Sequence, residues 1–172
     1  GDVYKRQPLI LSIIFLLKIT GEGEIFFFQE RVGMNNKVFK LYKFATMLKN
    51  SPLIGSGEVT IKNDPRVLPF GKFLRMTKIN ELPQLVNVIK GQMSLIGPRP
   101  QTRRCFEAFP SDIQNILIKM KPGLSGIGPI LTRSEDQMLQ SSENVINFYD
   151  NELAPYKGKI EVWYLDKQRI SI

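Results

Sequence analysis

The pattern of apolar and polar residues opens with an almost uninterrupted apolar run at Pro8–Ile19, PLILSIIFLLKI. A helix of this length reaches about 18 Å and a bilayer core is about 30 Å thick, so the run cannot span a membrane. Such a run is typical of a re-entrant membrane segment or of a helix buried in a soluble core. Lys18 near its end can place its amine at a membrane interface. Residues 1–7 differ in character and are predicted to be a non-native leader.

Two extended segments follow the apolar run. Glu24–Arg31, EIFFFQER, is rich in phenylalanine, and Val38–Met47 alternates between two sets of side chains. Phenylalanine enrichment and a period of two residues favour β-strands. The next stretch, Asn50–Pro69, contains glycine, proline and an Asn-Asp-Pro sequence, and is predicted to be loops and turns.

The clearest helical pattern in the chain is at Asn80–Lys90, NELPQLVNVIK. Asn80 is a favourable N-cap, Pro83 falls in the first turn, and Gly91 follows the last residue as a stop signal. The spacing i, i+3, i+4, i+7 predicts a helix with one apolar face, formed by Leu82, Leu85, Val86 and Ile89.

Further helices are predicted at Phe70–Met76, at Ser111–Met120 and at Ser141–Leu153, with a turn rich in proline and glycine at Lys121–Gly128. In the second of these helices a serine cap precedes the expected inward-facing residues Ile113, Ile116, Leu117 and Met120. The 172 residues predict one domain of the α+β class, rich in helix and with short strands.

The composition limits the partners and the catalytic groups that the chain can have. A net charge of +8 and a pI near 9.6 suit an anionic partner, which could be nucleic acid, acidic lipid or a phosphorylated substrate. The absence of histidine excludes His-based triads and His-ligated metal sites. Cys105 is the only cysteine, so an internal disulfide is impossible, and we expect a buried thiol. Acid–base chemistry therefore falls mainly to carboxylates, lysines and hydroxyls.

A series of motifs resembles the bacterial sugar transferases, also called monotopic phosphoglycosyl transferases. Their usual text is close to "GkfLR", "DELPQL", "NvlkGdMS" and "GPRP". Here these motifs correspond to Gly71–Arg75, Asn80–Leu85, Asn87–Ser94 and Gly97–Pro100. Three more segments resemble the family's "QeRvG", "YKF" and "rPGitG": Gln29–Gly33, Tyr42–Phe44 and Lys121–Gly126. Many motifs in the family's order make the resemblance strong, although each alone is weak.

The resemblance implies a small monotopic, membrane-associated domain at the cytoplasmic face of the bacterial inner membrane. Residues 8–20 would be the remnant of a re-entrant membrane helix, with Pro8 at its bend. Residues 21–172 would be the catalytic domain, truncated at its C-terminus. The implied reaction transfers a phosphosugar from a UDP-sugar to polyprenyl (undecaprenyl) phosphate and releases UMP, with Mg²⁺ as cofactor. In the family, the aspartate of the "DE" pair attacks the β-phosphate and forms a covalent intermediate.

The resemblance also implies a set of site residues. Asn80 and Glu81 would be catalytic, and Glu81 could also hold Mg²⁺ or move a proton. Arg75, Arg99 and Lys43 would bind the phosphates of the substrates. The chemistry agrees, because arginine forks bind phosphate oxygens through two parallel hydrogen bonds and a helix N-terminus attracts anions.

Three positions depart from the family pattern: Asn80 replaces the nucleophilic aspartate, Ala45 a basic residue, and Gln92 the aspartate of "GdMS". An amide cannot form an acyl-phosphate. Either Glu81 or direct attack by the acceptor then replaces the usual step, or the chain is a catalytically impaired member that serves as an assembly partner.

A nucleic-acid-binding protein is a third possibility, but no basic stripe with interleaved aromatic residues supports it, so we expect no nucleic-acid partner.

Overall fold

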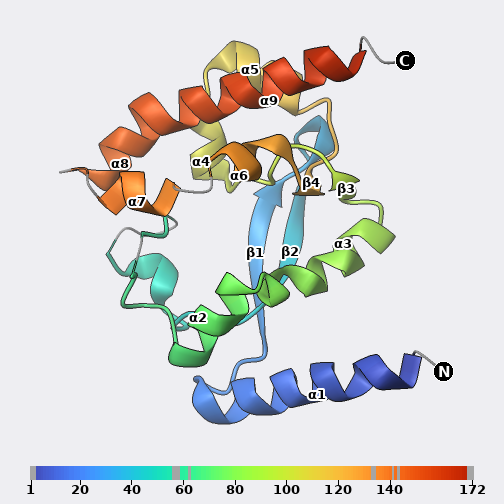
Figure 1. Cartoon of the computed structure of the whole chain (residues 1–172). Helices are drawn as coiled ribbons and strands as arrows, with labels where there is room; N and C mark the ends of the chain where they lie inside the picture. Colours follow the sequence, from blue (N-terminus) through green and yellow to red (C-terminus); the bar gives the residue numbers. More distant parts are fainter. Residues whose placement is uncertain are drawn as a thin grey trace.

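A two-stranded hairpin forms the centre of the computed structural model, which describes residues 3–55, 59–61, 63–132, 135–140, 142 and 144–169. Helix α1 (Val3–Thr20) lies at one end of the hairpin and helix α9 (Ala154–Arg169) at the opposite end, with shorter helices between them (Figure 1). The prediction of a helix-rich α+β domain with short strands is confirmed.

The hairpin pairs β1 (Phe26–Val32) with β2 (Val38–Phe44) in antiparallel register, from Phe26 opposite Phe44 to Val32 opposite Val38. Both strands were predicted, with bounds that differ by at most three residues. A 3-10 turn, η1 (Met34–Asn36), joins them. Asn35 and Asn36 have positive φ angles of 56° and 62°, a region that asparagine enters more readily than most residues.

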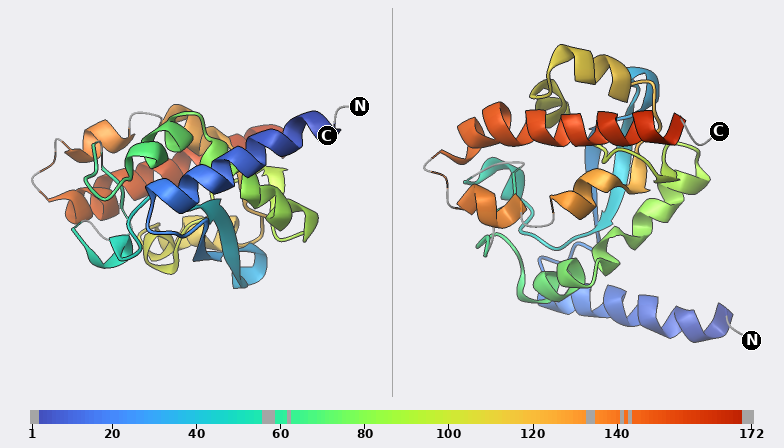
Figure 2. Two further views of the ribbon diagram at one scale, coloured as in Figure 1. Left: turned by 90° about the horizontal axis from the view of Figure 1, so that it is seen from below. Right: turned by 45° about the horizontal axis from the view of Figure 1, so that its top comes forward.

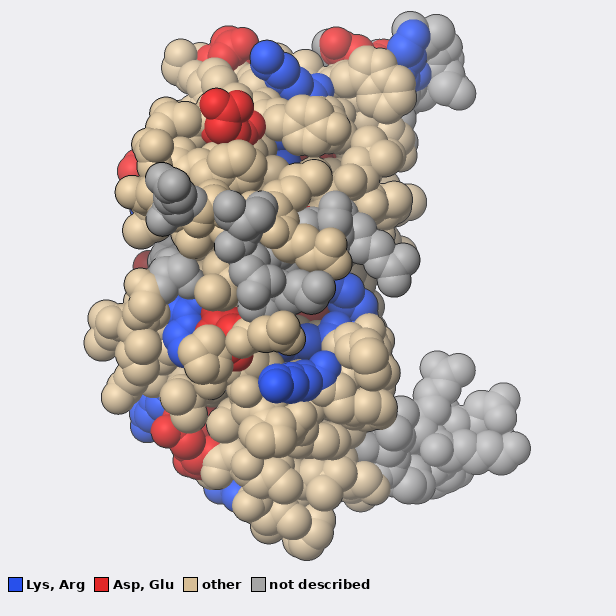
Figure 3. Space-filling view, turned by 60° about the vertical axis from the view of Figure 1, so that its left-hand side comes forward, with Lys and Arg blue, Asp and Glu red and all other residues tan. Residues whose placement is uncertain are grey.

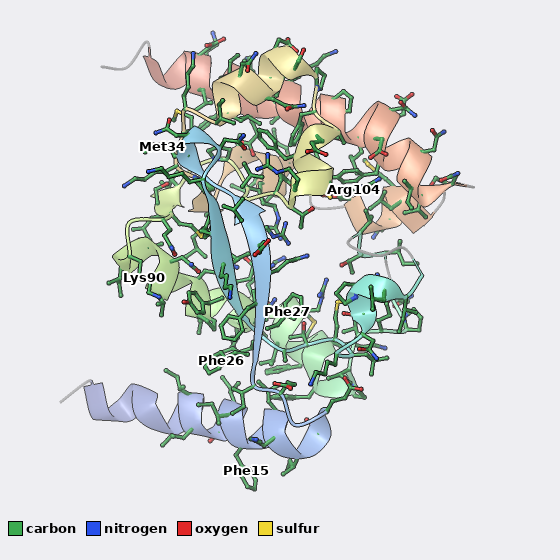
Figure 4. The ribbon with its side chains drawn as sticks, turned by 180° about the vertical axis from the view of Figure 1, so that it is seen from behind. Phe15, Phe26, Phe27, Met34, Lys90 and Arg104 are labelled. Carbon is green, nitrogen blue, oxygen red and sulfur yellow. The ribbon has the colours of Figure 1, made fainter. Side chains whose placement is uncertain are left out.

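From Ile10 onward helix α1 is mostly apolar, and two of its side chains are buried against the rest of the chain. Ile13 and Leu17 are buried in a small cluster with Phe44 and Leu74. Leu11, Phe15 and Ile19 on other sides are more than 60% exposed, and Phe15 points away from the body of the molecule in Figure 4. No helix in the described part of the chain is long and apolar enough to cross a membrane. The re-entrant segment and the leader at residues 1–7 stay predictions.

The segment after β2 leads to three short helices. Loop residues before Pro69 are held by Arg66, whose buried guanidinium pairs with Asp64 and donates to main-chain carbonyls of Ser51, Ile54 and Val59. The loop includes a short 3-10 turn, η2 (Ser51–Leu53). Then follow α2 (Pro69–Met76), the 3-10 helix η3 (Ile79–Gln84) and α3 (Leu85–Ile89).

The predicted single helix at Asn80–Lys90 is wrong in two respects. Lys78 has a positive φ of 59° and turns the chain so that η3 begins at Ile79, which places Asn80 inside a helical turn instead of at an N-cap. Pro83 lies inside η3 and has no N–H to donate, and the 3-10 geometry ends one residue later, at Gln84, before α3 begins. Gly91, with φ of 70°, follows the end of α3 as predicted.

The main apolar core lies at the end of the molecule that carries α9. It contains Cys105 and Phe106 of α4 (Arg103–Glu107), Phe109 in the turn that follows, Ile113 and Leu117 of α5 (Ser111–Leu117), and Leu153 and Ala154 near the start of α9. Burial of the single thiol is thus confirmed. For α5 the prediction was partly wrong: Pro110 occupies the N-cap, and Ile116 and Met120 are 38% and 36% exposed.

A second, two-stranded parallel sheet connects the centre to this core. It pairs β3 (Ser94–Ile96) with β4 (Gly123–Ser125), and α6 (Ile127–Leu131) follows. The predicted turn at Lys121–Gly128 therefore contains a short strand and the start of a helix. A side chain at Gly97 or Gly123 would overlap main-chain atoms of the other segment, so only glycine permits this close approach.

The chain then continues through α7 (Glu135–Gln140), α8 (Val145–Phe148) and a π-helical turn, η4 (Tyr149–Leu153), into α9. The predicted helix at Ser141–Leu153 is thus two shorter elements within its described residues, and Ser141 itself lies outside them. Figure 2 shows α9 lying across one end of the molecule and α1 at the other.

Candidate functional site

Glu81 forms the centre of the candidate site. Its Oε1 lies 3.4 Å from Nη2 of Arg99 and 3.8 Å from Nζ of Lys43, and its side chain is only 15% exposed. The three residues come from η3, from the segment after β3 and from β2, so the fold brings together parts of the chain that are far apart in sequence. The predicted grouping of Glu81, Lys43 and Arg99 is therefore present in the structure.

The ionisation of this cluster follows from burial and from its positive charges. Burial lowers the pKa of Lys43 to about 7; Glu81 opposes this decrease, and Arg99, Arg31 and Arg75 add to it. Burial alone would raise the pKa of Glu81, but Lys43 and Arg99 outweigh it and hold that pKa below its ordinary value. The carboxylate is thus ionised at neutral pH, whereas the amine is poised to lose its proton.

A pocket adjoins the Lys43–Arg99 side of the cluster. Its lining residues are Arg31, Leu41, Lys43, Gln84, Arg99, Pro100, Gly123 and Leu124. Arg31 donates from Nη1 to the Pro100 carbonyl at 3.1 Å, which ties β1 to the segment that carries Arg99. On the face shown in Figure 3, several lysine and arginine side chains lie between the upper and lower parts of the molecule, with acidic side chains among them. A concave surface of this charge suits phosphate groups.

Arg75, the third predicted phosphate-binding residue, also lies near the cluster. It lies in the last turn of α2, is partly buried, and is close enough to lower the pKa of Lys43. Its positive charge therefore contributes to the site's field. The contacts to the Glu81 carboxylate come from Lys43 and Arg99.

Asn80 precedes Glu81 in η3 and is buried, with 6% of its surface exposed. Its Oδ1 atom has no hydrogen-bond partner among the described residues. Lys78 is the N-cap of η3, so Asn80 is not a helix cap, and an unpaired buried acceptor costs free energy. Asn80 adjoins Glu81 in the chain, and its catalytic role stays a prediction.

The arrangement of the Glu81 helix depends on Asn87, which sequence reasoning did not select. Asn87 is fully buried and accepts from the Tyr42 N–H at 3.1 Å. Its Nδ2 donates to the Lys40 carbonyl and to Oε1 of Gln92, each at 2.8 Å. These bonds attach α3 to β2 next to Lys43. A signal was available, because Asn80, Gln84 and Asn87 form a second stripe with helical spacing.

Arg99 is placed by the parallel β3–β4 sheet. Gly97 donates its N–H to Ser125 O at 3.0 Å, and Gly123 donates to Pro98 O at 2.8 Å. The Gly97–Pro100 segment is thereby held over the glycine-rich turn, and its arginine reaches Glu81.

The comparison with known families adds independent evidence. The profile described as "Bacterial sugar transferase" matches residues 4–171, almost the whole chain. The chain belongs to this family. The match includes the residues of the Glu81–Lys43–Arg99 cluster and confirms the resemblance derived from the motifs.

Individual members of the sugar transferase family are 34% to 41% identical to this chain. The chain is 41% identical over 70% of its length to a UDP-N-acetylgalactosamine-undecaprenyl-phosphate N-acetylgalactosaminephosphotransferase of Aeromonas hydrophila, covering 29% of that protein. It is 39% identical over 83% of its length to a UDP-glucose:undecaprenyl-phosphate glucose-1-phosphate transferase of Klebsiella pneumoniae, covering 31% of that protein. The exopolysaccharide production protein ExoY of Sinorhizobium fredii is 34% identical over 75% of this chain and is 63% covered. The chain thus spans about a third of the first two relatives.

Proposed function

We propose that this chain transfers a phosphosugar from a UDP-sugar to polyprenyl (undecaprenyl) phosphate and releases UMP, as the first membrane step of surface polysaccharide or glycoconjugate synthesis. The observation that carries the proposal is the ionised, partly buried Glu81 between Lys43 and Arg99, beside a pocket rich in basic residues. A donor diphosphate and an acceptor phosphate bring several negative charges together, and such a cluster neutralises them. The names of the relatives support the same reaction class.

In this proposal the carboxylate of Glu81 takes the place of the family's aspartate. Its oxygen attacks the β-phosphorus of the donor, the bond from that phosphorus to the UMP oxygen breaks, and UMP leaves as an anion. An oxygen of polyprenyl phosphate then attacks the same phosphorus and releases the carboxylate. Arg99 and Lys43, which pair with Glu81 in the free protein, would turn to the phosphoryl oxygens as charge develops there.

Mg²⁺ fits the donor atoms of this site. Mg²⁺ prefers oxygen ligands and is commonly bound by one or two carboxylates together with substrate phosphates. Glu81 supplies one carboxylate, and the neighbouring Asn80 Oδ1 is a buried oxygen without a hydrogen-bond partner among the described residues. Glu81 and the donor phosphates would hold the ion, which would neutralise phosphate charge when bound.

We also propose that the end of the molecule that carries α1 rests on the cytoplasmic face of the bacterial inner membrane. Helices α1 and α2 lie at this end, and η3 and α3 follow them in the chain (Figure 1). All four elements expose apolar side chains, namely Leu11, Phe15 and Ile19 of α1, Phe73 and Met76 of α2, Leu82 of η3, and Leu85, Val86 and Ile89 of α3. Exposed apolar surface on this scale marks a membrane or protein contact. A membrane face also places the site near a lipid-linked acceptor.

The reaction is tested by release of UMP from a panel of UDP-sugars, with Mg²⁺ and undecaprenyl phosphate, using the whole chain in lipid nanodiscs. Mass spectrometry after donor alone then tests for a phosphosugar adduct on wild type and on Glu81→Gln. We expect turnover and an adduct on wild type and neither on the variant. Turnover that survives Glu81→Gln would remove this carboxylate from the mechanism. Turnover without an adduct would favour direct attack by the acceptor.

Asn80 favours a second candidate, a catalytically impaired member of the family that acts as an assembly partner. Asn80 is buried directly before the ionised Glu81 in η3, at the position where the family has its nucleophilic aspartate. If the chain is impaired, Asn80→Asp should create turnover and an adduct that the wild type lacks. If Glu81 carries the reaction, the wild type should already turn over.

The membrane proposal is tested by flotation with vesicles of phosphatidylglycerol and phosphatidylethanolamine. Phe15→Glu should weaken vesicle binding, because it places a charge on the exposed side of α1. Ile130→Glu is a matched control, since Ile130 in α6 is 62% exposed and Phe15 is 64% exposed. Equal loss of binding in both variants would contradict a contact through the α1 end.

A further inference from the structure

Glu161 is a buried acidic residue that neither the motifs nor the proposed chemistry uses. It lies in α9, at the end of the molecule opposite α1, and only 5% of its surface is exposed. Its carboxylate accepts hydrogen bonds from the main-chain N–H groups of Arg99 and Gly128. A methyl group at Gly128 would overlap with Oε1 of Glu161, so the carboxylate packs directly against this glycine. One side chain thus joins α9 to two separate segments of the site region.

A carboxylate at this depth is costly unless its oxygens are satisfied. Burial raises the pKa of Glu161, while the two main-chain N–H groups and the charge of Lys157 oppose that increase. Lys157, one turn earlier in α9, donates to both oxygens of Glu135 at 2.9 and 2.8 Å, so its amine is already committed to a different acid. The principal direct ligands of Glu161 are therefore main-chain groups, and one of them belongs to Arg99.

The position of the Arg99 main chain matters because its side chain reaches Glu81. From Arg99 the guanidinium extends to Oε1 of Glu81 at 3.4 Å, while the N–H of the same residue is held by Glu161. The parallel β3–β4 sheet fixes the preceding residues Gly97 and Pro98. Glu161 provides the next fixed point, at the residue whose side chain enters the site.

We propose that Glu161 is a positioning residue, which holds the Arg99 main chain so that its guanidinium can bind the substrate phosphates beside Glu81. This inference rests on the proposed phosphosugar transfer. Glu161→Gln keeps the shape of the side chain but presents an NH₂ group to one of the two N–H donors. The loss of one charge-assisted hydrogen bond is expected to lower kcat/KM by about ten-fold.

The experiment is a double-mutant cycle on the whole chain in nanodiscs, with wild type, Glu161→Gln, Arg99→Ala and the double variant. If Glu161 acts through Arg99, Glu161→Gln should change kcat/KM by less than about two-fold in the Arg99→Ala background, because the two effects are not additive. Val162→Ala is the control. It removes a partly buried side chain from the same helix and should lower Tm while leaving kcat/KM unchanged below Tm.

Gly128→Ala provides a second route to the same contact, since it displaces the carboxylate without changing α9. It should also lower kcat/KM and show no additivity with Arg99→Ala, even where Glu161→Gln fails to fold. Full additivity, or wild-type kcat/KM in both variants, would overturn the positioning role alone. A wild type that releases no UMP from any donor would instead overturn the proposed function, and the positioning role with it.

Discussion

Two regions of the molecule use the same helical spacing with opposite results. In η3 and α3 the polar Asn80, Gln84 and Asn87 are buried, whereas the apolar stripe from Leu82 to Ile89 is 42–85% exposed. In α5 the pattern is the usual one, with Ile113 and Leu117 buried against α9. The first region therefore buries its polar stripe and exposes its apolar stripe, which is the reverse of the second.

The difference teaches that the two regions obtain their stability from different sources. The α5–α9 region buries apolar surface within the chain, which is the ordinary driving force of folding. The η3–α3 region is attached through hydrogen bonds between Asn87 and β2 and through Ile79 and Val88, which pack on small apolar clusters. Its stripe from Leu82 to Ile89 stays exposed and is available for contact with a membrane. It follows that substitutions in the two regions should affect different measurements.

The largest effect is expected from Glu81→Gln, at the site end of the molecule. Removing the carboxylate should lower UMP release by about a thousand-fold or more, as is typical when a group that acts as a unit with its neighbours is lost. Glu107→Gln is the matched control, because Glu107 is an exposed acid in α4. Equal activity of the two variants would show that the site lies elsewhere.

A matched pair of leucine substitutions tests the contrast directly. Leu153 is 3% exposed and Leu85 is 42% exposed. Leu153→Ala should lower the free energy of unfolding by about 2–5 kcal/mol, because it leaves a cavity in the main core. Leu85→Ala should cost less than about 1 kcal/mol but weaken binding to lipid vesicles. Denaturant unfolding and vesicle flotation measure the two quantities, and a reversed order in either would break the comparison.

Arg99→Ala should act on the reaction more than on the fold. A lost charge-assisted phosphate contact corresponds to about 1.5–3 kcal/mol, or roughly ten- to a hundred-fold in kcat/KM. The exposed Arg103, which donates to Oδ1 of Asn36 at 2.7 Å, provides an arginine control outside the site. Parallel losses of Tm and kcat/KM in the Arg99 variant would indicate a structural role.

The smallest expected effect is a pH dependence of Tm that arises from Lys43. Its pKa is lowered from 10.5 to about 7 in the folded chain, first of all by burial. Between these two values the unfolded chain binds more protons at this position, so the group's contribution to stability rises with pH. The Tm of wild type should therefore rise relative to that of Lys43→Met as the pH increases above about 7, by about 2–4 °C per kcal/mol. Parallel Tm curves for the two proteins would contradict the lowered pKa.

The sequence predicted the elements whose pattern depends on local chemistry. The phenylalanine-rich β1, the alternation in β2, the helix at Pro69–Met76 and the stop at Gly91 follow from propensity and spacing. Motif order also grouped Glu81 with Arg99 and Lys43. The predictions of helices and strands succeeded because nearby residues determine most of the structure concerned. The grouping of Glu81, Arg99 and Lys43 came instead from the family resemblance, because these residues are far apart in the sequence.

The features that the sequence did not predict depend on distant parts of the chain. Periodicity identifies an apolar stripe but does not show whether the stripe faces the protein core or the surroundings of the molecule. The exposure of Ile89 therefore could not be inferred. The left-handed Lys78 moved the helix start and made the N-cap prediction for Asn80 wrong. Glu161 gave no local signal, because its role arises only when α9 packs beside the Arg99 segment.

The close contact between Gly97 and Gly123 also sets how far this site can be varied by mutation. At either position a single added methyl group would meet main-chain atoms, which cannot move aside as a flexible side chain can. A library of random substitutions should therefore recover almost nothing but glycine at these two positions. The adjacent Leu95 and Ile96, which are 60% and 65% exposed, should accept many replacements. Attempts to change donor preference by directed evolution should leave this crossing intact and vary the lining residues around it.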